Sequence, residues 1–75
     1  MNKDEHLEWC KKRALEYLNP GKYYSLEDAF LSMMSDIGKH DETTNHDGIK
    51  IGMMLKMSGF MQTEKQVKEW IIGFN

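Results

Sequence analysis

The sequence predicts a single all-α domain over residues 1–75, a compact bundle of four short helices that self-associates. Apolar residues recur at spacings of three and four in successive segments, which places them on one face of a helix. Strand signals are almost absent, because no Asn-Gly turn separates two alternating apolar and polar runs. With 75 residues, the chain has material for one small core.

The first helix is expected over residues 3–18. Leu7, Cys10 and Ala14 share one face, and acidic side chains come early while basic ones come late, as the helix dipole favours. The Asn-Pro-Gly run at 19–21 ends this helix, because proline cannot continue it.

Capping patterns mark the start of two further helices, expected over residues 26–38 and 64–73. Ser25 and Thr63 are each followed, three positions on, by an acidic or amide residue, as in a capping box. The last helix carries Trp70 on its apolar face, so we expect this indole in the core.

A third helix, over residues 48–58, is apolar on two sides. Ile51, Met54 and Leu55 lie on one side of a helical projection, and a second apolar group lies nearly opposite. The second group consists of Ile49, Met53, Met57 and Phe60. Such a helix must lie between two layers. We therefore predict an oligomer interface at Ile51, Met54 and Leu55; the alternative is a central helix wrapped by the other three.

Methionine is unusually frequent, with seven residues in the chain. Five of them are Met33, Met34, Met53, Met54 and Met57. Methionine fills gaps in cores and also lines surfaces that adapt to a partner. We expect these residues to fill the core, with the adaptable surface as the alternative.

Composition restricts the function classes. The formal net charge is −2, whereas a nucleic-acid binder usually shows a basic excess, so nucleic acid is an unlikely partner and a DNA-binding regulator is a weaker alternative. No apolar run reaches membrane-spanning length, and the first residues lack the apolar core of a signal peptide. A single cysteine, Cys10, fits a reducing compartment, so we expect a cytoplasmic protein.

The polar stretch at 39–47 contains two histidines and three carboxylates. Their spacing does not match a zinc or EF-hand site, so no metal is predicted. Potential anion donors gather before a helix N-terminus, where phosphate can bind, although acidic residues intervene. These donors are Lys39, His40, Thr43, Thr44 and His46. The favoured interpretation is a connecting loop in which Thr44, Asn45 or Asp47 caps the third helix.

Catalysis and cofactor binding find little support in the sequence. Cys10 lies on the apolar face of the first helix, where a buried, inert thiol is expected. The serines lack the strained turn of a nucleophile elbow. We therefore predict that the protein is not an enzyme and uses no cofactor.

Aromatic and basic residues supply the remaining candidates for binding. Trp9 lies off the apolar face of the first helix, close to Lys12 and Arg13, a composition typical of interface hot spots. Tyr24, in a loop, could stack on a partner. Whether Trp9 is exposed or covered by a neighbouring helix stays open at the level of sequence.

Four segments together resemble a known family. They read "HLEWCKKRALEYL", "SMMSDIGKHDETTNH", "IGMMLKMSG" and "VKEWIIGFN", and they span nearly the whole chain. This pattern is similar to a family of small uncharacterised proteins encoded by tailed bacteriophages and prophages. One departure is Asp41, where many relatives have proline.

The resemblance implies a phage origin and thereby a type of function. Small phage proteins outside the virion commonly bind a host macromolecule, and some counter host defence by binding the effector or by sequestering its nucleotide signal. The leading hypothesis is therefore an accessory binding protein that inhibits or redirects a host protein. The alternative is a binder of a nucleotide or other phosphate compound through the 39–46 loop.

Overall fold

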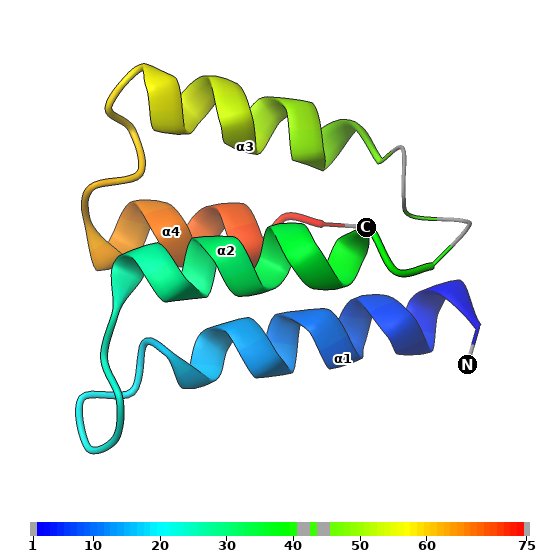
Figure 1. Ribbon diagram of the computed structural model, residues 1–75, viewed down its shortest axis with the longest axis horizontal. Helices are drawn as coiled ribbons and strands as arrows, with labels where there is room; N and C mark the ends of the chain where they lie inside the picture. The colour runs from blue at the N-terminus through cyan, green and yellow to red at the C-terminus, as the bar shows by residue number, and fades with distance from the viewer. Residues whose placement is uncertain (1, 41–42, 44–45, 75) are drawn as a thin grey trace.

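The computed structural model describes residues 2–40, 43 and 46–74. In this part of the chain it contains four α-helices and no strand: α1 (Lys3–Glu16), α2 (Leu26–Ile37), α3 (Asp47–Met57) and α4 (Glu64–Ile72) (Figure 1). The predicted all-α class is confirmed, and the expected helix boundaries differ from the observed ones by at most two residues.

Each of the four helices begins at a residue whose side chain caps it. The Asn2 side chain accepts a hydrogen bond from the Glu5 N–H at 2.9 Å, an N-cap that the sequence prediction did not include. Ser25 caps α2 and Thr63 caps α4, so both predicted caps are confirmed. Each cap satisfies a backbone donor that the helix itself leaves without a partner.

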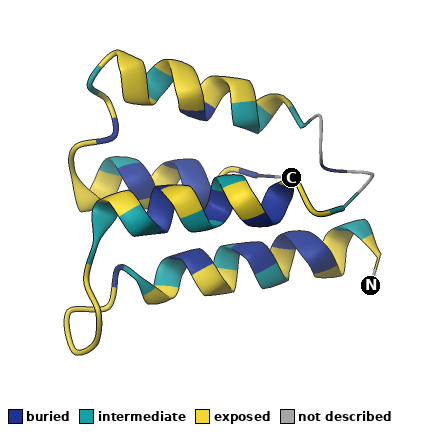
Figure 2. Cartoon of the chain, viewed as in Figure 1, coloured by how far each residue is buried: buried dark blue, intermediate teal, exposed yellow. Residues whose placement is uncertain are grey.

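The core is built mainly by α1, α2 and α4, whose buried faces meet in the middle of the molecule (Figure 2). Trp70 is 7% exposed, which confirms its predicted place in the core. Cys10, also predicted to be buried, is fully enclosed. The buried apolar residues are Leu7, Cys10, Ala14, Leu18, Ala29, Phe30, Met33, Ile37, Met61, Val67, Trp70, Ile71 and Phe74.

Helix α3 lies at the edge of the molecule, on the opposite side from α1 (Figure 1). Gly52 is its only buried residue, so the interpretation of a central helix wrapped by the other three is wrong. The expectation that the methionines fill the core is also wrong for three of them: Met53, Met54 and Met57 are exposed. Met33 is in the core and Met34 packs against it.

Glycine brings α3 close to the core. Gly48 and Gly52 lie against the rings of Phe74 and Trp70, and the Trp70 indole N–H donates a hydrogen bond to the Gly48 carbonyl at 3.0 Å. A side chain at either glycine would occupy the space that the aromatic rings now fill. The core therefore contacts the backbone of α3 at these positions, and most of its large side chains project elsewhere.

The helices are too short or too polar to cross a membrane: within the described residues, none is long and apolar enough to do so.

Candidate functional site

A buried carboxylate organises the candidate site. Asp36, near the end of α2, is 1% exposed. Its Oδ2 accepts a hydrogen bond from Arg13 Nε at 2.8 Å, and its Oδ1 accepts one from Lys39 Nζ at 3.0 Å. The Arg13 and Lys39 side chains themselves are 52% and 57% exposed. Asp36 thus holds two cations in place at the surface, because charge-assisted hydrogen bonds are strong and directional.

The indole of Trp9 completes this arrangement. The Arg13 guanidinium carbon lies 4.7 Å from the centre of the ring, and Lys39 Nζ lies 5.9 Å from it. Trp9 is partly buried and packs against the core, which resolves the alternatives left open by the sequence. We call Trp9, Arg13, Asp36 and Lys39 the Trp9 cluster. It combines an aromatic ring with two cations, at distances where cation–π attraction operates.

Two histidines adjoin the cluster. The His6 ring stacks on Trp9 at a centroid distance of 5.7 Å and on His40 at 5.0 Å. His6 is buried, and its Nε2 lies 2.8 Å from the Asp36 carbonyl oxygen, to which it donates when protonated at that nitrogen. These contacts tie α1 to the end of α2. They fix the position of Asp36 and thereby of both cations.

The neighbouring thiol does not add a nucleophile at neutral pH. Cys10 Sγ lies 3.4 Å from His6 Nε2. Burial, reinforced by the Asp36 carboxylate, raises the pKa of Cys10 to about 11. The thiolate is the reactive form, so this cysteine stays protonated and inert. The cluster is suited to holding an anionic group rather than to covalent chemistry.

The loop residues divide between the cluster and structural roles. Lys39 and His40 lie beside Trp9 and His6. Thr43, by contrast, is fully buried, and its hydroxyl donates to the Ile37 carbonyl at 2.7 Å. Thr43 thus holds the loop against the end of α2.

His46 is the N-cap of α3. Its Nδ1 accepts a hydrogen bond from the Gly48 N–H at 2.9 Å, and its ring packs on Phe74. The expectation that Thr44, Asn45 or Asp47 caps this helix is therefore wrong. Thr44 and Asn45, like Asp41, lie outside the described residues.

The other two candidates lie apart from the cluster or at its margin. Lys12 is exposed and borders a shallow pocket that Trp9, Leu15 and Ile72 also line. Tyr24 is exposed in the connector that precedes α2, where partial desolvation and the Glu64 carboxylate raise the pKa of its phenol. The structure thus brings Trp9, Arg13, Lys39 and His40 together and places Tyr24 elsewhere.

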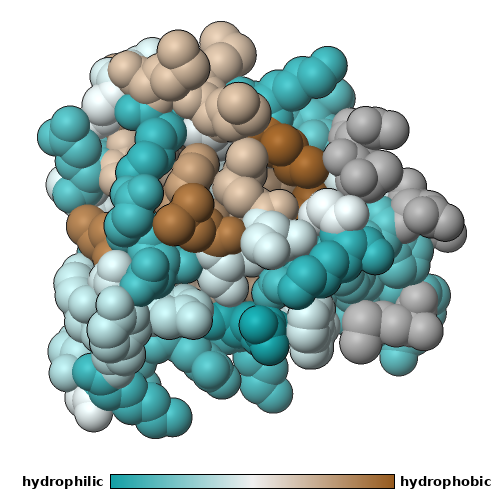
Figure 3. Space-filling view, viewed as in Figure 1, coloured by the Kyte–Doolittle hydropathy of each residue, from teal (hydrophilic) through white to brown (hydrophobic). Residues whose placement is uncertain are grey.

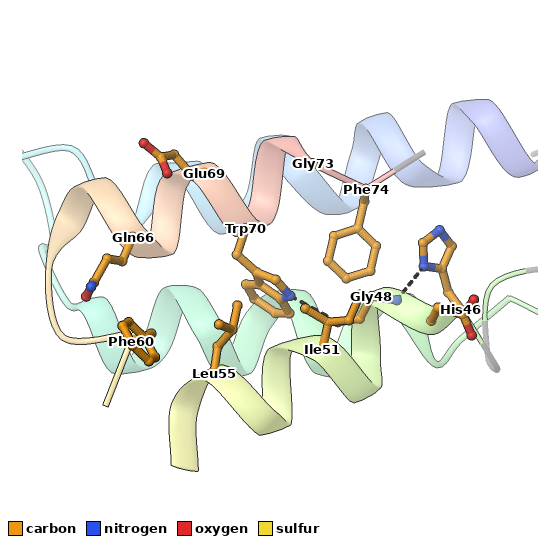
Figure 4. A pocket seen from close by; sticks show the side chains of 11 residues that line it. His46, Gly48, Ile51, Leu55, Phe60, Gln66, Glu69, Trp70, Gly73 and Phe74 are labelled. Atoms are coloured by element: carbon orange, nitrogen blue, oxygen red, sulfur yellow. Dashed lines mark hydrogen bonds between the residues drawn. The ribbon is translucent and has the colours of Figure 1, made fainter. Parts of the chain in front are cut away.

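A groove between α3 and α4 was not predicted. It has a volume of about 570 Å³, and Figure 4 shows its floor, where Trp70 and Phe74 project toward α3. Acidic and amide groups edge it, among them Asp47, Gln66 and Glu69. The sequence signal for this close approach was the pair of glycines four residues apart, Gly48 and Gly52.

No metal centre is found in the described part of the chain: no three histidine, cysteine, aspartate or glutamate side chains there are grouped to hold an ion. Compared with known protein families, with curated proteins and with solved structures, the chain matches none of them.

Proposed function

We propose that this chain is a phage accessory binding protein that engages a host macromolecule in the cytoplasm of the infected bacterium. The supporting observation is the Trp9 cluster, in which a buried carboxylate orders two half-exposed cations beside an indole. Tryptophan and arginine are the residues most enriched at interface hot spots. A protein of this type acts by covering or redirecting its target, without chemistry of its own.

Preorganisation supports the same proposal. Free arginine and lysine side chains lose rotamer entropy when a partner immobilises them. Asp36 already holds Arg13 and Lys39 in position, so much of that cost is met during folding. The half-exposed side chains of these two cations favour an acidic group on the surface of the partner.

The same geometry supports a second candidate function, the sequestering of a nucleotide or other phosphate compound. Arginine and lysine are the usual ligands of phosphate. Here the side chains of Arg13 and Lys39 lie close together, because both are bound to the Asp36 carboxylate. The phosphate site predicted in the 39–46 loop loses two of its candidate ligands, because the Thr43 hydroxyl and His46 Nδ1 are hydrogen-bonded to the backbone. The phosphate would lie at Arg13 and Lys39.

Native mass spectrometry on protein isolated from host cytoplasm without a denaturing step tests both candidates. The wild-type chain is compared with Arg13→Gln, and Lys68→Gln on α4 is the matched control because it removes one exposed cation elsewhere. We expect the wild type and Lys68→Gln to carry a host protein that Arg13→Gln has lost. If all three retain the same partner, or none carries one, the proposed contact is wrong.

A bound small mass instead of a protein would select the second candidate. Titration with nucleoside phosphates at millimolar concentration then provides the check, because a ligand that binds the folded state raises the melting temperature. The rise is expected for the wild type and Lys68→Gln and not for Arg13→Gln. An unchanged melting temperature in all three would eliminate phosphate sequestering at this cluster.

A further inference from the structure

We propose that the groove between α3 and α4 binds a flat, apolar small molecule that carries one positive charge. The groove has a volume of about 570 Å³, and small-molecule sites measure about 300–1,000 Å³. At about 30 Å³ for each water-sized group, it has room for roughly twenty non-hydrogen atoms. None of the residues of the Trp9 cluster lines it, so the inference goes beyond the proposed function and does not depend on it.

The lining of the groove is mainly apolar. Trp70 and Phe74 form the floor, and their rings meet edge to face at a centroid distance of 5.2 Å. Ile51 and Phe60 are 51% and 57% exposed, and half-buried Leu55 lies between them (Figure 4). A flat apolar molecule would remove this surface from water, and an aromatic one would add ring contacts. The shape and the lining therefore favour an aromatic ligand.

The charged groups at the groove favour a cation. Asp47 and Glu69 border it, and no lysine or arginine is among the described residues that line it. Neither carboxylate belongs to an ion pair in the described part of the chain, where the paired acids are Asp36 and Glu27. The N-terminus of α3 contributes about half a positive charge, which the full charge of Asp47 in its first turn outweighs. A positive group on the ligand is therefore attracted and a negative one repelled.

Glu69 is the carboxylate that we expect to meet the cation. It lies on α4, at the same end of the groove as Gln66 and Phe60 (Figure 4). Its side chain is exposed, and no hydrogen bond or ion pair within the described residues fixes the carboxylate, so it can turn toward a ligand. Asp47 is already stabilised by the N-terminus of its own helix. The rings of the ligand would then lie over Trp70.

The groove differs from the other apolar surface of α3. Figure 3 shows apolar side chains gathered over α3 along the upper edge of the molecule, where Met53, Met54 and Met57 are exposed. These methionines do not line the groove, and their side chains carry no charge. Met53 and Ile51 are each 51% exposed on the same helix, but only Ile51 lines the groove. Met53 is therefore a matched control position.

Two molecules with the same ring system and opposite charges test the proposal. Pyrenylmethylammonium is positive and pyrenecarboxylate is negative, and each is titrated into isotope-labelled protein. NMR follows the indole N–H signals of Trp9 and Trp70, which a Trp9→Phe variant assigns. We expect the cation to shift the Trp70 signal and not the Trp9 signal, and the anion to bind about 5-fold more weakly or less. Equal binding of both molecules, or no shift at Trp70, overturns the proposal.

A charge-removing variant tests the role of Glu69. Glu69→Gln is compared with Glu16→Gln, because Glu16 is also exposed but lies on α1, outside the groove. We expect the dissociation constant of pyrenylmethylammonium to rise by about 2- to 5-fold for Glu69→Gln, as for one exposed ion pair, and to stay unchanged for Glu16→Gln. An equal rise in both variants would show a general attraction to an acidic protein and would contradict a site at Glu69.

A change in the groove wall tests the location independently. Ile51→Lys is expected to weaken pyrenylmethylammonium binding by about 10-fold, because it removes apolar contact and repels the cation. Met53→Lys makes the same change off the groove and should have little effect. An equal loss in both variants places binding elsewhere. If Ile51→Lys does not fold, the comparison at exposed Glu69 still decides the question.

A second copy of the chain is the competing occupant, because Ile51 and Leu55 are also predicted from the sequence to lie in an oligomer interface. Dilution of the protein without any added molecule distinguishes the two. The Trp70 indole signal should stay in place at all protein concentrations. A Trp70 signal that moves with protein concentration would show that another copy covers the groove, and it would overturn the proposal.

Discussion

Gly52 lies directly against the indole of Trp70: a β-carbon added to this glycine would be 2.5 Å from the Cζ2 atom of the ring. One turn earlier, the Gly48 carbonyl accepts the hydrogen bond from the same indole. The core therefore holds α3 by its backbone. This relationship explains why a helix with so many large apolar side chains leaves most of them uncovered.

The first prediction concerns this contact. Gly52→Ala is expected to destabilise the protein by about 1–3 kcal/mol, the usual cost of overpacking, although alanine favours a helix over glycine by about 1 kcal/mol. Urea unfolding followed by circular dichroism measures the loss. Gly38→Ala is the control, since its nearest neighbour would be at 3.5 Å, and it should stay within about 0.5 kcal/mol of the wild type. An equal loss in both variants would show that the indole is not the cause.

The second prediction concerns the carboxylate at the centre of the Trp9 cluster. Asp36→Asn leaves one acceptor oxygen for two cationic donors and removes the charge that holds them. We expect a loss of about 1–3 kcal/mol in the free energy of unfolding. Glu69→Gln, the same change at an exposed position on α4, should have almost no effect. If Asp36→Asn is equally neutral in urea unfolding, Asp36 does not organise the cluster.

The third prediction is a pH dependence from Cys10. Burial raises the pKa of this thiol from 9.0 to about 11, so the folded state keeps a proton that the unfolded chain loses. The resulting stability is complete below about pH 9 and falls as pH rises toward 11, by at most about 2.7 kcal/mol. Other groups titrate in this range, so the measured quantity is the difference in unfolding free energy between the wild type and Cys10→Ala. This difference should shift with pH; a constant difference contradicts the buried thiol.

The fourth prediction concerns the cap of α3. His46→Ala removes the acceptor for the Gly48 N–H and the ring that packs on Phe74, and we expect a loss of about 0.5–2 kcal/mol. His46→Asn restores a good capping side chain and should recover part of the loss. Hydrogen exchange of the first amides of α3 locates the effect. If both variants open α3 equally, the cap contributes little and the ring contact dominates.

Local signals explain which parts of the fold could be predicted. Ser25 and Thr63 each cap a helix by accepting a hydrogen bond from the residue three positions later, so a short stretch of sequence is enough to predict this role. The buried faces of α1, α2 and α4 follow helical periodicity in the same way. The position of a helix within the bundle cannot be predicted from such local signals. Whether α3 lies at the centre or at the edge depends on which residues pack against it, and the residue that packs against Gly52 is Trp70, 18 residues later in the chain.

The candidate site shows the same division. Trp9 and Arg13 are one helical turn apart, and their pairing was visible in the sequence. Asp36 was not singled out, because its burial depends on Arg13 arriving from a different helix. Thr43 and His46 were read as free donors, yet one hydroxyl holds a loop and one imidazole caps a helix. The sequence does not show which backbone group a polar side chain will hydrogen-bond to in the folded protein.

Attachment through glycine has an evolutionary consequence. Because the core contacts the main chain of α3 at Gly48 and Gly52, the side chains on the other side of the helix contribute little to the packing of the fold. Substitutions at Met53 or Met57 can therefore accumulate without disturbing Trp70. The outer surface of α3 can therefore change its side chains while the rest of the fold stays constant, and Gly48 and Gly52 are the positions at which substitution should be tolerated least.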